Sequence, residues 1–312
     1  MDLDGAASAL GLACGLLDGA ARHLAVHGGV DGNQVVAYDL AHAAAAVNTA
    51  RAALEYGHEG NVEARIACAF VADAVWDVMV KVLGREERWG TTPDALQGAA
   101  GFVRTYRDPE FLANLAAAEG PRHLDTDFEL VRETFRRFAE DRIKPVAEHV
   151  HRTNGDIPED IITGLAEMGG FGLSVPEEYG GFASGGESDY LGMVIATEEL
   201  SRGSLGVGGS LITRPEILTR ALVRGGTEEQ KQYWLPRIAS GELLVAVAVT
   251  EPDFGSDVAG LKVTATGTAD GWLINGVKTW CTFAARADVL MLLARTDPDR
   301  SKAHRGLSLF VV

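Results

Sequence analysis

The feature that most constrains the fold is a change in the spacing of apolar residues near Gly241. Before this glycine, apolar residues recur every three or four positions, as one face of a helix requires; after it they form short runs typical of strands. We expect strands at 243–250, 261–268, 272–274, 277–282, 289–294 and 307–312. A block of helices followed by strands, without βαβ alternation, disfavours a doubly wound sheet and predicts an α+β, multidomain chain.

An extra helical segment is expected over residues 1–120. One helix is predicted from Val62 to Leu83, ending before Gly84, which suits a C-terminal cap. The residues expected on one face of an earlier helix are Ala37, Leu40, Ala41, Ala44, Val47 and Leu54. Residues 85–121 are expected to be a connector with one or two short helices, so that a boundary falls near residue 120. This segment could be a docking surface, an oligomer contact or a vestigial helical domain.

A second helical domain is expected over residues 121–240, followed by a β domain over residues 241–312. Thr126-x-x-Glu129 and Thr227-x-x-Gln230 have the pattern of capping boxes, which predicts that each threonine caps a helix. A helix is predicted from Asp156 to Met168, and others near Asp189 and Thr227. Pro145 should kink or end the first helix of this domain. The chain ends inside an apolar run, so we expect it to be cut short.

Charge and cysteine content narrow the function. With 28 basic and 44 acidic residues the net charge is 28 − 44 = −16, which repels phosphate and argues against binding nucleic acid. The three cysteines Cys14, Cys68 and Cys281 form no CxxC pair, which agrees with a reducing compartment. We find no apolar run of the ~18 residues that a membrane span needs and no signal peptide, and we expect a cytoplasmic protein.

Several common chemistries lack their motifs. His23 and His27 could share a helix face, but no third ligand has a matching spacing, so we expect no metal site. The sequence also has no nucleophile elbow, Walker A loop or GxGxxG after a strand.

Two segments of the predicted β domain could bind a ligand. The apolar run 245–249 leads into Thr250-Glu251-Pro252-Asp253-Phe254-Gly255-Ser256-Asp257, where hydroxyl groups and a glycine backbone can approach a ligand closely. Asn275-Gly276 predicts a tight hairpin, which would place Trp280-Cys281-Thr282 at the end of its second strand. An indole ring can lie against a flat conjugated ring while a neighbouring hydroxyl group donates to it.

Together these segments resemble the acyl-CoA dehydrogenase family, whose flavin-binding segments read TEPxxGSD and W-x-T/S. The resemblance covers roughly residues 124–312, including Gly172–Gly181 and Gly226–Glu242. It implies an all-α N-terminal domain and a β-barrel-like middle domain, here incomplete, with FAD as cofactor. The positions that the resemblance assigns to FAD are Val247, Val249, Thr250, Gly255, Ser256, Trp280, Cys281 and Thr282. Ser256 would also contact the CoA thioester, and Trp280 and Thr282 would flank the flavin ring and its N5.

The reaction implied is α,β-dehydrogenation of an acyl-CoA, in which a carboxylate removes the α-proton and the β-hydrogen leaves as hydride. We expect the catalytic base beyond Val312 and assign it to no residue here. Residues 213–226, 278–312 and the N-terminal segment are similar to the subgroup that oxidises (2S)-methylsuccinyl-CoA to mesaconyl-CoA in the ethylmalonyl-CoA pathway. Such a substrate has a distal carboxylate, and our hypothesis is that Arg214 binds it. The commoner role of an arginine is at the surface.

Family members are usually homodimers or homotetramers that pass electrons to an electron-transfer flavoprotein, so both partners are expected. Other functions stay open: another short-chain or glutaryl-type dehydrogenase, a flavin oxidase, a flavin-binding relative without dehydrogenase activity, or a fragment unable to bind FAD. The charge of −16 argues against a relative associated with DNA repair.

Overall fold

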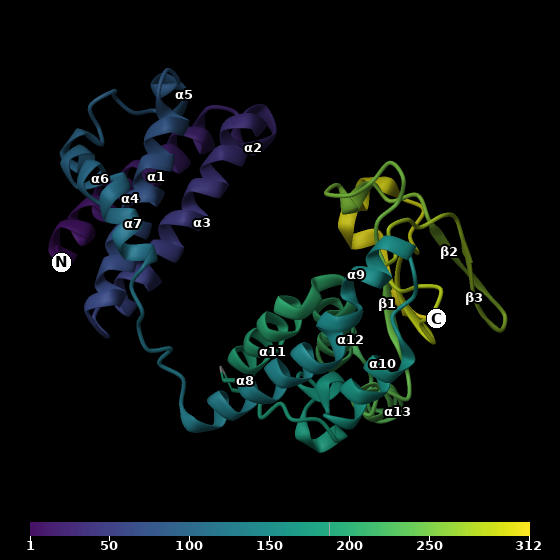
Figure 1. Cartoon of the computed structure of the whole chain (residues 1–312). Coiled ribbons are helices and arrows are strands. Elements are labelled where there is room, and N and C mark those ends of the chain that lie inside the picture. The colour runs from purple at the N-terminus through teal and green to yellow at the C-terminus, as the bar shows by residue number, and fades with distance from the viewer. Residues whose placement is uncertain (187) are drawn as a thin grey trace. The chain divides into compact units, whose positions relative to one another are not determined.

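A computed structural model describes residues 1–186 and 188–312 of the chain (Figure 1). The chain forms two compact units, Met1–His123 and Leu124–Val312. The division follows His123, close to the boundary expected near residue 120. Each unit has its own hydrophobic core and is described by itself.

The N-terminal unit is helical (Figure 1). Its helices are α1 (Leu3–Val26), α2 (Gly29–Gly32), α3 (Gln34–Tyr56), α4 (Asn61–Val82), α5 (Glu86–Trp89), the 3₁₀ helix η1 (Gln97–Ala99), α6 (Ala100–Tyr106) and α7 (Pro109–Ala116). Helices α1, α3 and α4 pack against one another through faces rich in Ala, with Leu on α1 and Val on α3 and α4. The helix predicted to end before Gly84 is confirmed, because α4 ends at Val82 and Gly84 has a φ of 77°.

Two expectations for this unit need correction. Of the face expected on α3, Leu40, Ala44, Val47 and Leu54 pack in or against the core as expected, whereas Ala41 is exposed. The fully buried residues of α3 are Val36, Ala43, Val47 and Ala50. Residues 85–121 are also more than a connector. Trp89, Leu96, Ala99, Val103 and Tyr106 are buried in the same core as the residues of α1, α3 and α4.

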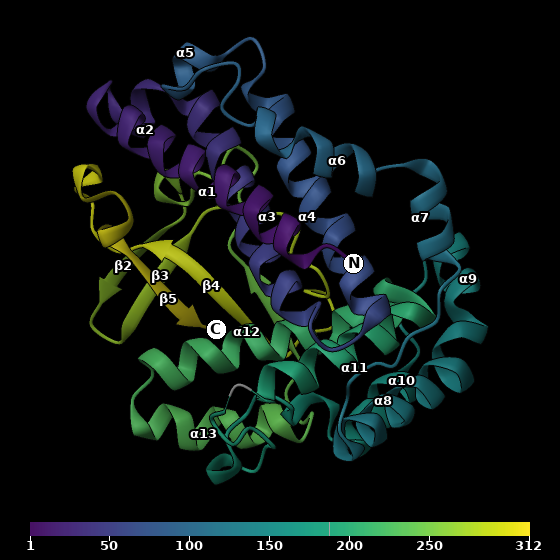
Figure 2. The same cartoon turned by 90° about the vertical axis from the view of Figure 1, so that its left-hand side faces the viewer.

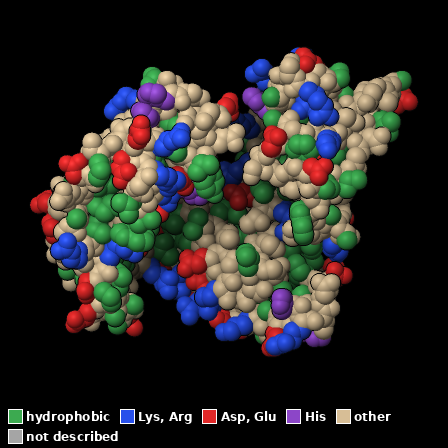
Figure 3. Space-filling model, turned by 90° about the horizontal axis from the view of Figure 1, so that it is seen from above, with side chains coloured by type: hydrophobic (Ala, Val, Ile, Leu, Met, Phe, Trp, Pro, Cys, Tyr) green, Lys and Arg blue, Asp and Glu red, His purple; other side chains and the backbone are tan. Residues whose placement is uncertain are grey.

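Helix α1 corrects the expectation that no segment could span a membrane. By length and composition, this 24-residue helix is apolar enough to do so. Core helices of soluble proteins and signal sequences meet the same criterion, and 39% of its most apolar window is buried in the structure. The unit also exposes large apolar side chains on α4, among them Ile66, Phe70 and Val80. The space-filling view shows apolar side chains interspersed with charged ones (Figure 3).

The second unit begins with helices. They are α8 (Thr126–Phe138), the π-helical turn η2 (Ala139–Ile143), α9 (Lys144–Thr153), α10 (Glu159–Glu167), η3 (Gly170–Gly172), η4 (Glu177–Tyr179), α11 (Ser188–Ser204), the π-helical turn η5 (Leu205–Gly209), α12 (Ser210–Gly225) and α13 (Glu228–Ala239). The capping box of Thr227 and Gln230 is confirmed in both directions.

The first capping box is wrong. Asp125 is the N-cap of α8 and accepts a hydrogen bond of 2.9 Å from the amide of Phe128, because a carboxylate one position earlier competes well for the free amides. The Glu129 carboxylate instead accepts from Arg132. Pro145 lies in the first turn of α9, directly after the π-helical turn, so the helix changes its winding there rather than ending.

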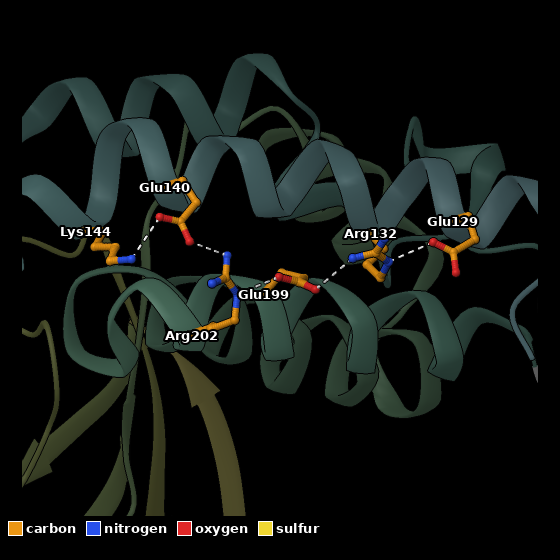
Figure 4. A network of polar contacts seen from close by, with 6 residues as sticks. All are labelled: Glu129, Arg132, Glu140, Lys144, Glu199 and Arg202. Atoms are coloured by element: carbon orange, nitrogen blue, oxygen red, sulfur yellow. Dashed lines mark hydrogen bonds and ion pairs between the residues drawn. The ribbon is translucent and has the colours of Figure 1, made fainter. Parts of the chain in front are cut away.

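A buried carboxylate ties three of these helical segments together (Figure 4). Glu199 of α11 is 2% exposed and pairs with Arg202 at 3.0 Å and with Arg132 of α8 at 3.6 Å. Arg202 also reaches Glu140 of η2 at 2.6 Å, and Lys144 lies 3.0 Å from the same carboxylate. The Lys144 ammonium and the Arg202 guanidinium lower the pKa of Glu140. The network therefore favours one packing of α11 on α8.

The β part is an open, mixed five-stranded sheet (Figure 2). Its strands are β1 (Val245–Ala248), β2 (Thr264–Thr268), β3 (Gly271–Asn275), β4 (Val289–Arg295) and β5 (Leu307–Val311). The order is β1-β4-β2-β3, with β5 also on β4. Strand β1 runs parallel to β4, and β5 runs antiparallel to it. Helix α12 contacts β1, so the sheet and the helices of this unit share a core.

The hairpin predicted at Asn275-Gly276 is wrong. Strands β2 and β3 form the hairpin, with Thr268 opposite Gly271, and Asn275 is the last residue of β3. Residues 277–282 form no strand, and Trp280 within them has a φ of 56°, which lies outside the strand region. The tight turn consists of residues 269–270, and Gly271, which follows it, has a φ of 148°.

Candidate active site

The first candidate segment follows β1 directly. Val247 and Val249 are half-buried, and Glu251 and Phe254 close a tight turn through two backbone hydrogen bonds of 3.0 and 3.2 Å. The Asp257 carboxylate accepts a hydrogen bond of 3.1 Å from the amide of Gly260 and so fixes the far side of the turn. The buried strand thus leads into a rigid polar turn.

Gly255 and Ser256 directly follow this turn and are exposed, and we call these two residues the tip of the segment. A Cβ atom added at Gly255 would meet no protein atom within 4 Å, so packing within the chain does not require glycine there. Thr250, at the base of the turn, is half-buried. The backbone at Gly255 is therefore not covered by other parts of the chain.

The second candidate segment is an irregular turn between β3 and β4. The side chain of Trp280 is 86% exposed, and its carbonyl accepts a hydrogen bond of 3.0 Å from the amide of Thr282. Thr282 is exposed and Cys281 half-buried. The indole of Trp280 is exposed to water on a backbone with a positive φ, so it does not contribute to the hydrophobic core of this unit. Such an exposed aromatic side chain is typical of a residue that contacts a ligand or a partner.

The structure brings the two segments together at three points. The amide of Thr279 donates to the carbonyl of Thr250 at 2.9 Å. The ammonium group of Lys278 donates to the carbonyl of Val249 at 2.8 Å and to Oε1 of Glu251 at 3.0 Å. The side chains of Lys278 and Glu251 are 7% and 4% exposed, so this ion pair lies inside the unit.

Glu251 is a fixed anion. Burial opposes its ionisation, but hydrogen bonds from the amides of Lys262 and Val263 and from the Lys278 ammonium outweigh that effect and lower the pKa of Glu251. The two amides lie 2.7 and 2.9 Å from its oxygens. This carboxylate is a structural link between the segments and is poorly suited to accept a proton.

Sequence reasoning missed Lys278 and the structural role of Glu251. The available signal was weak: one lysine two residues before Trp280, and one glutamate at the end of an apolar strand. Their partnership spans 27 residues and depends on the irregular course of residues 277–282, which the sequence predicted as a strand.

Arg214 lies in α12, whose other buried residues are apolar except for Thr219. It is 6% exposed, and its guanidinium lies 5.0 Å from the centre of the Phe283 ring, directly after Thr282 in the chain. It is therefore not the surface arginine that the commoner interpretation predicts. Among the described residues no group of three or more His, Cys, Asp or Glu side chains could hold a metal ion.

Comparison with known proteins agrees with this geometry. Residues 125–242 match the model of the acyl-CoA dehydrogenase N-terminal domain, and residues 246–312 match that of the middle domain. The (2S)-methylsuccinyl-CoA dehydrogenase of Cereibacter sphaeroides is 46% identical over 222 residues, which are 71% of this chain and 38% of that protein.

Two solved structures share the fold. A glutaryl-coenzyme A dehydrogenase in complex with glutaryl-CoA is 36% identical, with a TM-score of 0.56 over 62% of this chain and 49% of that one. A glutaryl-CoA dehydrogenase from Mycobacterium smegmatis in complex with FADH2 is 31% identical, with a TM-score of 0.53 over 61% of this chain and 46% of that one. The chain thus spans less than half of these relatives. From its two matched domains and its fold, it belongs to the acyl-CoA dehydrogenase family.

Proposed function

We propose that this chain binds FAD and acts in the α,β-dehydrogenation of an acyl-CoA thioester, with (2S)-methylsuccinyl-CoA as substrate and mesaconyl-CoA as product. The observation that carries the proposal is the link between the two candidate segments through Lys278, Glu251 and Thr279. It holds an exposed indole and an exposed glycine turn on one rigid frame. The 46% identity to a methylsuccinyl-CoA dehydrogenase supports the choice of substrate.

The residues at the candidate site fit a flat, polar cofactor. Trp280 offers an aromatic face, and the tip at Gly255 and Ser256 offers backbone amides and a hydroxyl group. Thr282 would donate to a ring heteroatom, while Val247, Val249, Thr250 and Cys281 would line the base of the site. When bound, FAD supplies a two-electron acceptor for the hydride that leaves the β-carbon.

The protein must also stabilise the negative charge that develops on the thioester when the α-proton leaves. Ser256, at the exposed tip, is the residue that we propose to contact the thioester. The base must be a carboxylate with a free oxygen atom. Glu251 and Glu199 are each held by basic groups, so neither suits this role, and we assign the base to no residue of this chain.

The partners are part of the same proposal. We propose an electron-transfer flavoprotein as acceptor, a homodimer or homotetramer as the assembly, and a cytoplasmic location. The similarity to the family supports the first two. The reducing compartment suggested by three unpaired cysteines supports the third.

A panel of acyl-CoA substrates tests the function. Purified flavin-loaded protein would be assayed with methylsuccinyl-CoA, glutaryl-CoA, isovaleryl-CoA and butyryl-CoA and an artificial electron acceptor, and the products identified by mass spectrometry. We expect the highest kcat/KM with methylsuccinyl-CoA. Highest activity with glutaryl-CoA would instead favour the glutaryl-type alternative, which the 36% identity to such an enzyme from Desulfococcus multivorans keeps open.

A further inference from the structure

The N-terminal unit contains an apolar cavity of about 490 Å³, lined by parts of α1, α4 and α5 and by residues 92–100. The apolar side chains that line it include Leu16, Val82 and Leu96, which are buried, and Trp76, Val80 and Leu83, which are exposed. Cavities of this size and character are typical of sites for small molecules. The cavity lies outside residues 125–242 and 246–312, which match the dehydrogenase domains, so the proposed function does not account for it.

The indole of Trp76 is held in position although the residue is 41% exposed. The Arg107 guanidinium lies 3.7 Å from the centre of its ring, and Nε of Arg107 is 2.6 Å from the Asp73 carboxylate. Val80 and Leu83, which follow Trp76 toward the end of α4, are exposed as well. These three apolar side chains gain little from the core of the unit, whereas a ligand that covers them would remove their surface from water.

Two carboxylates, those of Glu86 and Asp94, also line the cavity, and none of the described residues that line it is basic. The amide of Gly84 donates a hydrogen bond of 2.9 Å to Oε1 of Glu86 and lowers the pKa of that carboxyl group. Hydrogen bonding by the Thr92 side chain likewise lowers the pKa of Asp94. Both groups therefore carry a negative charge at neutral pH. Glu86 is half-buried and Asp94 is exposed, so the two charges lie at the open side of the cavity.

Neither charge has an internal partner. Among the residues that the structure describes, no basic group lies within ion-pair distance of Glu86 or Asp94. Arg85, next to Glu86 in the chain, lies 2.7 Å from Asp39 and is neutralised there. Arg88, the next basic residue after Glu86, does not line the cavity. The two anionic groups thus remain available to a cation from outside the chain.

An apolar lining with two unpaired anionic groups at its open side favours a ligand with an apolar body and a cationic end. A fatty acid or an acyl-CoA presents negative charge instead, which the carboxylates of Glu86 and Asp94 would repel. We propose that the cavity binds a small amphiphilic cation, with an ammonium or guanidinium group on an apolar body. The cationic group pairs with the two carboxylates, and the body covers Trp76, Val80 and Leu83. This site is separate from the proposed function, whose substrate carries the opposite charge.

Three probes with the same eight-carbon chain and different end groups test this on the whole chain. Octylammonium, octanol and octanoate would be titrated at neutral pH by isothermal titration calorimetry. We expect octylammonium to bind roughly 10-fold more tightly than octanol, and octanoate to bind more weakly than octanol, because only the end group differs. Added salt should reduce the preference for octylammonium, since both carboxylates reach solvent. Equal affinities of the three probes, tighter binding of octanoate, or no binding of octylammonium at millimolar concentration would overturn the inference.

A charge-neutral double variant tests the two carboxylates. Glu86→Gln combined with Asp94→Asn removes both charges, while the glutamine carbonyl can still accept from the amide of Gly84. We expect the roughly 10-fold preference for octylammonium over octanol to disappear and the affinity for octanol to stay the same. Glu87→Gln is the matched control, because Glu87 is exposed and does not line the cavity. An unchanged preference in the double variant, or the same loss in Glu87→Gln, would contradict the assignment.

A substitution in the apolar wall locates the probe. Val80→Lys places a positive charge among the exposed apolar side chains of the cavity and should weaken both octylammonium and octanol roughly 10-fold. Val26→Lys adds the same charge at an exposed position of α1 that does not line the cavity, and it should leave both affinities within about 2-fold. Unchanged affinity in Val80→Lys would show that the probes bind elsewhere and would overturn the inference. None of these measurements depends on flavin or on turnover of an acyl-CoA, so they are independent of the proposed function.

Discussion

The ammonium group of Lys278 lies 3.0 Å from Oε1 of Glu251, and both side chains are buried. The two residues belong to the two segments that resemble flavin-binding motifs, and Lys278 also reaches the backbone of the first segment at Val249. One buried ion pair therefore sets the distance between the polar turn at residues 250–257 and the exposed Trp280.

Removing Lys278 should damage both stability and cofactor binding. Lys278→Met leaves the Glu251 carboxylate buried without its cation, which typically costs about 3–5 kcal/mol of unfolding free energy. Urea denaturation and the flavin content of the purified protein measure the two effects. Lys262→Met is the matched control, because its pair with Asp253 is exposed and its loss should cost about 0–1 kcal/mol. Equal losses in the two variants would show that burial of the pair is unimportant.

The same pair predicts a pH dependence. The pKa of Glu251 is lowered in the folded protein, so the carboxylate adds stability above its unfolded value near 4.5 and loses it as the pH falls through the lower folded value. We expect the wild type to lose stability on acidification and Glu251→Gln to lose less over the same range. Chemical denaturation at pH values from 7 to 3 measures how the free energy of unfolding of each protein changes with pH. The same pH dependence in both proteins would show that Glu251 does not cause the loss of stability in acid.

Trp280 should matter for the cofactor and not for folding. Because its side chain is exposed, Trp280→Ala should leave the free energy of unfolding of the flavin-free protein within about 0.5 kcal/mol. Loss of an aromatic contact should weaken FAD binding roughly 5- to 10-fold, as measured by flavin fluorescence. Trp272→Ala, which removes a half-exposed tryptophan packed on Phe310, should not change FAD affinity. Unchanged affinity in Trp280→Ala would contradict the assigned role.

Two glycines should respond in opposite ways to alanine. Gly255→Ala places a methyl group in open space and should fold normally but bind FAD more weakly. Gly276→Ala should destabilise the fold by about 1–3 kcal/mol, because Gly276 has a φ of 141° and its Cβ atom would lie 2.6 Å from a Val263 methyl group. Thermal unfolding and FAD titration separate the two effects. Normal FAD affinity in Gly255→Ala would mean that no ligand approaches this backbone.

The cap of α8 offers a test that does not involve the site. Asp125→Ala should cost about 1 kcal/mol of unfolding free energy, and Thr126→Ala clearly less. Urea denaturation of both variants measures the difference. A larger loss of unfolding free energy in Thr126→Ala than in Asp125→Ala would show that Thr126 caps the helix, as the sequence predicted.

Local signals predicted the helices well, because their causes lie within a few residues. The glycine after α4 and the hydrogen bonds between Thr227 and Gln230 are such cases. The hairpin was misplaced because two turn signals compete: Asn275-Gly276 has the stronger local preference, but pairing of β2 with β3 uses residues 269–270. Register depends on the whole strand and not on the turn alone.

The candidate site was partly accessible from the sequence. Both segments were singled out: the first by the hydroxyl groups and glycine that follow an apolar strand, and the second by its place after the expected hairpin and by the resemblance to the family. Their connection through Lys278, and the buried, unpaired state of Arg214, were not accessible. Both depend on contacts between residues that are distant in the chain, and no spacing rule encodes them.

An anaerobic titration with (2S)-methylsuccinyl-CoA tests the central claim most directly. The purified flavin-loaded protein is followed in the visible absorption band of the flavin while substrate is added, and the product is identified by mass spectrometry. We expect the band to bleach as mesaconyl-CoA forms in equal amount. A bound flavin that keeps its colour with this substrate, or a purified protein that binds no flavin, would contradict the proposed function.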